Sequence, residues 1–313
     1  MQDRVRYSYL RLTRWNLAFL GTLIILGGCS QLGPKFIEGS RTDYNIVMGE
    51  TESEQMLLNL VRLRYGDAPY FLEATALNTQ FLFSPSAEAG STFDLNGNTT
   101  YAIKGKLAYE EKPTVTYSPL RGEDFVRQIL SRISLETILL LDSSGWSTER
   151  VLRLCVENIN GLDNASRASG PTPKDPPDVK EFNKAIELIS SLESENALLV
   201  REKLKANQSP GYVISLSQDS RYQSRITELL KLLKIDPSID EIGLFESNDL
   251  ASSAAIRFQT RSFMGVMYFL AQSVEIPQED YDARKVATTL LSDGGVFNWE
   301  AITGSLAKVH SSP

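Results

Sequence analysis

The fold class is decided by Phe93-Asp94-Leu95-Asn96-Gly97-Asn98-Thr99-Thr100-Tyr101. The dipeptide Asn96-Gly97 is typical of two-residue hairpin turns, because both of its residues adopt positive φ with little strain. Apolar and polar residues alternate on either side of the dipeptide, and this alternation continues to Tyr117. The sequence therefore predicts an antiparallel hairpin over 93–117, with one face buried and the other facing water or a partner.

Helical patterns lie on both sides of this hairpin. Thr51-Glu52-Ser53-Glu54 is typical of a capping box, and the apolar spacing that follows predicts a helix over 52–65 that ends near Gly66. Helical spacing returns over 125–141. The apolar run 151–159 fits either a covered strand or a buried helix, and its periodicity does not decide between them.

A break in composition at 166–178 divides the rest of the chain. This segment is rich in proline, glycine and serine, which predicts a surface loop or a linker. Beyond it, the patterns predict helices and strands in mixed order. The expected helices are 179–205, 221–234 and 260–274, and the expected strands are 212–216, 239–245 and 254–258. The fold class expected is α+β, an antiparallel sheet with packed helices in one large domain or two smaller ones.

The first thirty residues have the pattern of an export signal. Four arginines and one aspartate precede an apolar run from Leu17 to Leu26. The run has about half of the roughly 20 residues that a helix needs to cross a bilayer, so a signal that is removed is expected. Leu26-Gly27-Gly28-Cys29 follows directly and places two small residues before a cysteine.

This segment resembles the lipobox of bacterial lipoproteins. The resemblance implies that signal peptidase II cuts between Gly28 and Cys29 and that Cys29 carries the acyl chains that hold the protein on a membrane. Ser30 stands where lipoproteins kept at the inner membrane usually have aspartate, which favours the outer membrane, with the domain facing the periplasm. The segments 57–65 and 260–263 are similar to uncharacterised lipoproteins of Gram-negative bacteria.

The domain organisation expected from these patterns has five parts. They are a signal peptide at 1–28, a tether at 29–50, an α+β domain at 51–165, the loop or linker at 166–178, and a mixed helix and strand region at 179–313.

The net charge limits the classes of partner that the chain could bind, and the cysteine content limits its disulfides. The chain has a formal charge of −7, and removal of the arginine-rich leader makes it more acidic. This argues against nucleic acid and against anionic headgroups bound through bulk charge. With Cys29 acylated, Cys155 has no partner cysteine, so a buried free thiol is expected.

Catalytic and metal-binding motifs are absent from the sequence. The single histidine is His310, and no dinucleotide-binding, P-loop or zinc-protease motif occurs. No cofactor, metal or catalytic residue is therefore predicted, and a role other than catalysis is favoured. The acidic pairs Glu110-Glu111 and Glu279-Asp280 are interpreted as solvated surface.

Three arginines are candidate binding residues. Arg62 and Arg64 lie near the end of the predicted helix 52–65, where they could instead clamp this helix to the sheet. Arg261 stands at the start of an almost wholly apolar helix, where a cation opposes the helix dipole, so a carboxylate, backbone or ligand partner is expected. A structural ion pair is the alternative interpretation of all three.

Two functions of different class remain. The favoured hypothesis is a membrane-anchored interaction or scaffold protein that presents its α+β domain to an envelope protein partner. Its support is the lipid anchor, the lack of a catalytic constellation and the mixed polarity of the hairpin. The alternative is a carboxylate-dependent enzyme or binder that acts on cell-wall glycan or a small envelope ligand. A pocket holding two converging carboxyl groups would favour the alternative.

Overall fold

The computed structural model describes residues 32–93, 99–203, 211–239, 241–246 and 255–307. The chain divides into two units, 1–58 and 59–313. Gly28 and Cys29, the predicted cleavage and lipidation positions, lie outside the described residues.

The first described element is a 33-residue helix, α2 (Leu32–Arg64). The predicted start at the capping box is wrong. Thr51 and Ser53 instead donate hydrogen bonds from their hydroxyls to the carbonyls of Met48 and Gly49 in the preceding turn, as such side chains do inside helices. The expected tether is thus helical from Leu32 onward. The expected end is confirmed, since Gly66 has φ +80° just beyond the helix.

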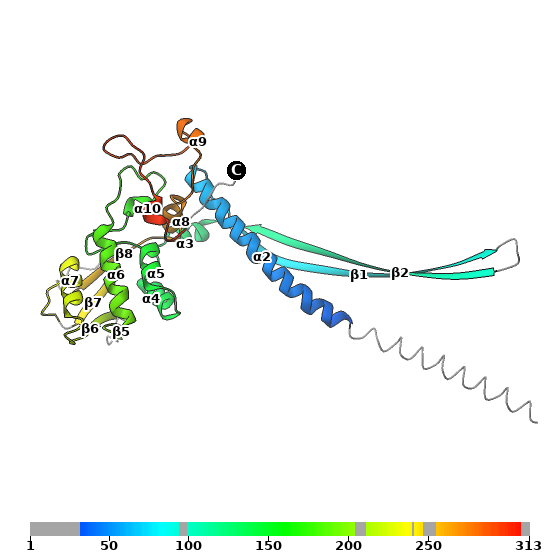
Figure 1. Ribbon diagram of the computed structural model, residues 1–313, viewed down its shortest axis with the longest axis horizontal. Helices are drawn as coiled ribbons and strands as arrows, with labels where there is room; N and C mark the ends of the chain where they lie inside the picture. The colour runs from blue at the N-terminus through cyan, green and yellow to red at the C-terminus, as the bar shows by residue number, and fades with distance from the viewer. Residues whose placement is uncertain (1–31, 94–98, 204–210, 240, 247–254, 308–313) are drawn as a thin grey trace, which may run out of the picture. The chain divides into compact units, whose positions relative to one another are not determined.

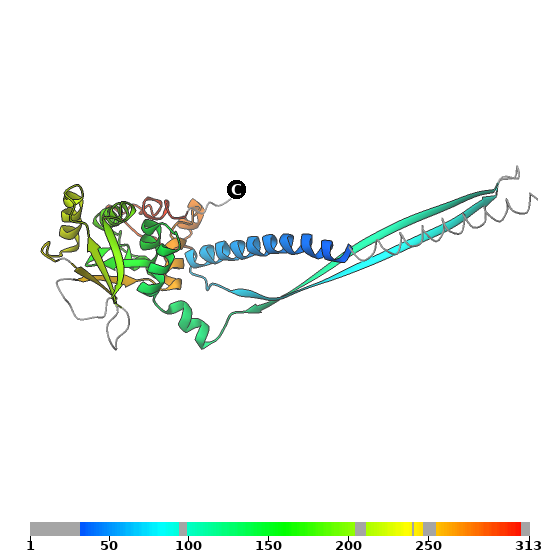
Figure 2. The ribbon, with the colours of Figure 1, turned by 90° about the horizontal axis from the view of Figure 1, so that it is seen from below.

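The predicted hairpin is present and longer than expected. Strands β1 (Leu72–Phe93) and β2 (Thr99–Pro119) pair antiparallel along their whole length, with one register shift between Ala74 and Ala76. They form a two-stranded sheet of their own, here called the ribbon, and run side by side in both views (Figures 1 and 2). The turn dipeptide Asn96-Gly97 lies outside the described residues.

The expectation that one face of this hairpin is buried is wrong where side chains are described. None of residues 72–80, 82 and 110–119 is buried, and Leu77 and Tyr117 are 40% and 46% exposed. Alternation in a sequence indicates which residues share a face, and it contains no information on whether another element covers that face. The ribbon therefore has an apolar face without internal cover in its described part.

A second sheet of six strands organises the rest of the unit 59–313. The strand order is β4-β3-β8-β7-β6-β5, and neighbours are antiparallel except for the parallel pair β7 and β8. The strands are β3 (Val156–Ile159), β4 (Leu162–Asp163), β5 (Leu198–Lys203), β6 (Gly211–Leu216), β7 (Glu241–Glu246) and β8 (Ala255–Thr260). The α+β class is confirmed.

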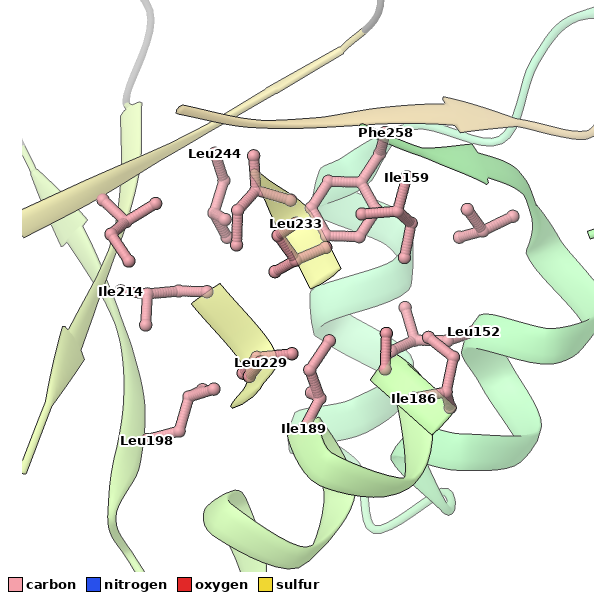
Figure 3. Close-up of a cluster of buried hydrophobic side chains, with 14 of the residues drawn as sticks. Leu152, Ile159, Ile186, Ile189, Leu198, Ile214, Leu229, Leu233, Leu244 and Phe258 are labelled. Atoms are coloured by element: carbon pink, nitrogen blue, oxygen red, sulfur yellow. The ribbon is translucent and has the colours of Figure 1, made fainter. Parts of the chain in front are cut away.

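Helices α4 to α7 cover one face of this sheet, and their apolar residues interlock with every second residue of the strands (Figure 3). Leu152, Ile186 and Leu229 point from three helices toward Ile214 and Phe258 of the sheet. The helices of this unit are α3 (Glu123–Leu130), α4 (Leu135–Ser143), α5 (Thr148–Cys155), α6 (Lys180–Ser194), α7 (Gln223–Leu233), α8 (Phe263–Ala271), α9 (Gln278–Asp282) and α10 (Glu300–Thr303), with a 3-10 turn η2 (Ser166–Ser169).

Two segments differ from the sequence-based expectation. The run 151–159 is both helix and strand, because α5 ends at Cys155 and β3 begins at the next residue. The expected helix 179–205 is wrong beyond Ser194, because the chain turns at Asn196, which has φ 56°, and returns as β5.

The loop at 166–178 connects parts of one sheet. Strands β3 and β4 precede it and β5 to β8 follow it, yet all six pair in a single sheet. This arrangement favours one domain over two and makes the segment 166–178 a surface connection inside that domain.

Candidate functional site

Arg261 is fully buried, with 0% of its surface exposed. Its Nη1 donates to the backbone carbonyls of Arg153, Leu154 and Val156 at 3.2, 3.0 and 2.8 Å. Its Nε donates to the hydroxyl of Ser169 at 3.0 Å. The expected partner therefore exists, and it is mainly backbone.

The position of these carbonyls explains the electrostatic role of Arg261. They lie at the C-terminal end of α5, where the last carbonyls of a helix lack intrahelical partners and the dipole is negative. Nη2 also donates to the carbonyl of Asn164, and the guanidinium lies over the ring of Phe269. Burial lowers the pKa of Arg261 to about 10, while the charge of Glu157 opposes this shift, so the side chain remains a cation at neutral pH.

The position of Arg261 in the chain explains why the dipole of α8 does not disfavour its positive charge. Ser262 caps α8 by accepting a hydrogen bond from the backbone N–H of Gly265, so Arg261 precedes the helix. Its side chain serves a different helix end. Because the guanidinium is fully buried and each of its nitrogens is bonded to protein atoms, Arg261 is a structural residue that a ligand cannot reach.

Arg64, the last residue of α2, is in a different situation. It is 6% exposed, and its Nη1 donates to the carbonyl of Ala287 at 2.9 Å. Its Nε is buried and has no hydrogen-bond partner among the described residues. Burial lowers the pKa of Arg64, and the hydroxyl groups of Tyr281 and Tyr65 partly oppose this shift. The idea that Arg64 clamps α2 to the sheet is wrong, because Ala287 lies in the segment after α9.

Arg62 is half-buried, and no hydrogen bond or ion pair joins its side chain to another described residue. It lies on the same last turn of α2 as Arg64, whereas Arg261 belongs to the end of α5. The three candidate arginines therefore do not form one site.

A cavity of about 350 Å³ adjoins Arg64. Gln272, which follows α8 and is 5% exposed, lies on the same wall, and its Oε1 also lacks a partner among the described residues. Aromatic and polar side chains complete the lining, among them Tyr281, Asn298 and Trp299. A volume above about 300 Å³ is within the range of small-molecule sites.

A second constellation joins two carboxyl groups that sequence reasoning did not single out. The Oγ1 of Thr148 lies 2.6 Å from Asp142 Oδ1 and 2.6 Å from Glu193 Oε2. Asp142 is in α4, Thr148 begins α5 and Glu193 is near the end of α6. No local spacing signals this convergence, because it depends on how three helices pack.

Proton counting shows that this cluster holds an extra proton. A hydroxyl donates one hydrogen, so the second short contact of Thr148 requires a protonated carboxyl. Burial raises the pKa of Glu193 to about 7; the bond from Thr148 lowers this pKa, and the neighbouring Asp142 raises it. Glu193 therefore keeps its proton up to about neutral pH.

The carboxyl cluster borders a small apolar pocket between the helices and the sheet. Except for Asp142, Thr148 and Glu193, its lining is wholly aliphatic or aromatic. Its volume is about 50 Å³, far below the roughly 300 Å³ of the smallest usual ligand pockets. In the described conformation it accommodates only a small apolar group.

Asn59 was also not predicted, although it organises the approach to the ribbon. Its side-chain amide is fully buried, donates to the carbonyl of Tyr70 at 2.9 Å and accepts from the N–H of Tyr70 at 2.9 Å. This paired contact holds the segment that leads from α2 into β1. An asparagine in an amphipathic helix gives no sequence signal for such a role.

No group of three or more His, Cys, Asp or Glu residues arranged to hold a metal occurs within the described ranges. The helices that the structure describes also include none with both the length and the apolar character needed to cross a membrane. No family model, curated protein or solved structure matches the chain.

Proposed function

We propose that the protein is an outer-membrane lipoprotein, anchored through Cys29, whose ribbon β1–β2 binds an envelope protein partner. The anchor rests on the lipobox Leu26–Cys29. The observation that carries the binding role is the ribbon itself, which pairs over 22 and 21 residues without joining the six-stranded sheet.

Stability considerations support a partner for the ribbon. An isolated two-stranded hairpin is at best marginally stable in water, and three strands or packing against another element are usually needed. Among the described residues no third strand pairs with the outer edge of β1 or of β2, and such edges are templates for strand addition. A partner that adds a strand or covers one face would supply what the ribbon lacks.

The register sorts the ribbon into two chemically different faces. Directly paired residues share a face, so Leu77 and Val115 lie on one side and Asn78 and Thr114 on the other. The face of Leu77 also includes the positions of Phe81, Phe83, Phe93, Tyr101, Ile103, Leu107 and Tyr109, with Glu111 among them. The face of Asn78 includes Gln80, Ser84, Ser86, Glu88, Lys104, Lys106, Glu110 and Lys112, with Leu82 among them. The apolar face suits a protein partner with apolar side chains.

Two adjacent residues of β1 lie on opposite faces, so a crosslinking experiment at one has a matched control at the other. A photo-crosslinking residue at Thr79, on the apolar face, should give one adduct of defined mass in intact cells, and the same residue at Gln80 should give little. Leu77→Asp should abolish the Thr79 adduct, because it places a charge on the apolar face. Asn78→Asp, one residue away on the polar face, should leave it unchanged.

Three results would count against this proposal. They are no adduct from either position, an adduct that is equally sensitive to Leu77→Asp and Asn78→Asp, and an adduct of twice the mass of the chain. The last would identify a second copy of this chain, and not a different envelope protein, as the occupant.

The convergence of Asp142 and Glu193 favours a second candidate, a carboxylate-dependent binder of a small envelope ligand. Both carboxyl groups bond the hydroxyl of Thr148, and they line an apolar pocket. Glycoside hydrolysis is disfavoured, because both carboxyl groups bond the hydroxyl of Thr148, which occupies the space between them that the scissile glycosidic bond would need. Glu193→Gln should abolish binding of an envelope extract component by the purified chain if this candidate is correct, and should leave the ribbon adduct intact.

A further inference from the structure

The six-stranded sheet has one face covered by helices and one face that solvent reaches. Ile214, Leu244 and Phe258 are buried and point toward the helices (Figure 3). Successive residues of a strand point to opposite sides, so their neighbours in sequence belong to the second face. Val213 and Phe245, although they lie in the interior strands β6 and β7, are only half-buried. This second face, here called the outer face, includes Arg201, Lys203, Val213, Gly243, Phe245 and Arg257.

Positive charge exceeds negative charge on the outer face. The side chains of Arg201 and Arg257 form no ion pair or hydrogen bond with another residue that the structure describes. Lys203 is bonded to Glu241, and this contact, with a smaller effect of Arg201, lowers the pKa of that carboxyl group. In a chain of formal charge −7, a local excess of positive charge favours an anionic partner. The described charged groups in or beside the face are Arg132, Arg201, Lys203 and Arg257 against Glu157 and Glu241, an excess of two positive charges.

An aromatic ring lies between the two unpaired arginines. The strand register places Gly243 in one row with Arg201, and it places Phe245 directly beside Arg257. The ring of Phe245 leans back over Gly243, where an added Cβ atom would come within 2.5 Å of it. Glycine at this position therefore gives the ring room to lie along the sheet. A half-buried ring on an accessible sheet face offers apolar contact surface to a partner.

We propose that the outer face binds an acidic segment of a partner protein in an extended conformation. An apolar side chain of the segment packs on Phe245, and two carboxylates pair with the guanidinium groups of Arg201 and Arg257. The strands of these arginines, β5 and β8, are three strand spacings apart, which is about 14 Å. Residues i and i+4 of an extended chain are about 13 Å apart and share a side with residue i+2. This site is separate from the ribbon and does not depend on the ribbon's proposed role.

The charge balance favours a protein segment over a polyanion. The positive excess is confined to the outer face, and the chain as a whole is acidic. A nucleic acid or a highly charged polysaccharide carries charge on every unit, so the parts of it beyond the face would be repelled. A segment with two carboxylates on either side of an apolar residue matches both the arginines and the ring.

Two peptides of identical composition test the predicted spacing, measured by calorimetry with the full chain in detergent. The probe acetyl-Glu-Ser-Phe-Ser-Glu-amide, when extended, places both carboxylates on the same side as its phenylalanine. The isomer acetyl-Ser-Glu-Phe-Glu-Ser-amide places them on the opposite side. The probe should bind saturably, and the isomer should bind at least roughly fivefold more weakly. Added salt should weaken binding of the probe, because exposed ion pairs are screened.

Substitution of single cations tests the charge contacts. Arg201→Gln and Arg257→Gln should each weaken binding of the probe roughly threefold to fivefold and reduce its salt dependence. Lys231→Gln is the matched control, because Lys231 is an exposed cation of α7, a helix on the opposite face of the sheet. It removes the same charge from the chain and should leave the affinity unchanged.

Two further variants test the aromatic ring without removing a charge. Gly243→Ala adds a Cβ atom that displaces the ring of Phe245, and Phe245→Ser removes the ring. Each should weaken binding of the probe roughly fivefold. The salt dependence should stay as in the wild type, because both arginines are still present.

The proposal is overturned by no saturable binding of the probe up to about 10 mM, by equal binding of the two peptides, or by equal effects of Arg201→Gln and Lys231→Gln. Two other occupants would also overturn it. An oligothymidine that binds more tightly than the probe would assign the outer face to nucleic acid. A dimer that Arg201→Gln dissociates, measured by sedimentation, would assign it to a second copy of this chain.

Discussion

The guanidinium carbon of Arg261 lies 4.1 Å from the centre of the Phe269 ring, so a cation that precedes α8 stacks on an aromatic residue of that helix. The edge of the same plane donates to the carbonyls that end α5. One side chain therefore joins two helices through two kinds of contact. A planar, multiply donating cation is required for this, and lysine does not provide it.

Arg261→Ala should lower the free energy of unfolding by about 3–5 kcal/mol, because it leaves several buried carbonyls without donors. Arg261→Lys should remain strongly destabilising. Chemical denaturation of the purified chain measures both, and Arg62→Ala, at a half-buried position, should cost only about 0–1 kcal/mol. An Arg261→Ala protein as stable as the wild type would refute the structural role.

Asn59→Ala should lower the free energy of unfolding by about 1–3 kcal/mol, because the N–H and C=O of Tyr70 both lose their partner. Asn59→Asp should not rescue stability, since a carboxylate accepts from the N–H but cannot donate to the carbonyl. The exposed Asn78 of β1 is the control, and its alanine variant should stay within about 0.5 kcal/mol of the wild type. Equal effects at the two positions would contradict the pairing.

Glu193 should make stability fall as pH rises. Its pKa is raised from 4.5 to about 7 in the folded chain, so between these values the folded state retains a proton that the unfolded state has lost. The stabilisation is complete below about pH 4.5 and is lost as pH rises through about 7. Glu193→Gln should remove this dependence, measured as the difference in unfolding free energy from the wild type at each pH.

The nearby Glu195 is a control of opposite sign. The hydrogen bond from Arg225 lowers the pKa of Glu195, so its contribution is present above the unfolded pKa and is lost as pH falls. Glu195→Gln should thus lower stability at neutral pH and make no difference at acid pH, where the carboxyl group has lost its charge. If Glu193→Gln changed nothing between pH 4.5 and 7, the raised pKa of Glu193 would be disproved.

Cys29→Ala should abolish incorporation of radiolabelled palmitate, because the proposed acyl acceptor is removed. Cys155→Ala is the matched control, since Cys155 is buried in the core and burial raises the pKa of its thiol, which makes acylation there unfavourable. Label retained by Cys29→Ala at the wild-type level would refute the lipid anchor.

The sequence was informative where a local pattern determines a local structure. The hairpin and most helices after residue 120 followed from alternation and spacing, whereas the register did not, since a two-residue turn at Asn96-Gly97 would pair Phe93 with Thr100 and the structure pairs it with Thr99. The sequence-based prediction was wrong where neighbouring structure or strand pairing outweighs a local sequence signal. Thr51 and Ser53 resemble a helix start, but the preceding residues are already helical. The turn at Asn196 converts a predicted helix into β5, since strand pairing with β6 outweighs helical spacing.

The candidate sites were less predictable, because they combine residues from distant segments. Arg261 was expected to have a partner, but its carbonyls lie on α5, more than 100 residues earlier. Asp142 and Glu193 converge only after three helices have packed together. Sequence spacing cannot show such encounters, and no pattern distinguished Arg64, which faces a cavity, from Arg62, which does not.

The ribbon also has a consequence for how its length can change. From Ala76 onward its register is regular, so inserting two residues in each strand preserves both faces, whereas inserting one in each exchanges them. Each two-residue step extends the ribbon by about 7 Å. The length of the ribbon can therefore change in steps of two residues per strand without altering the chemistry of either face.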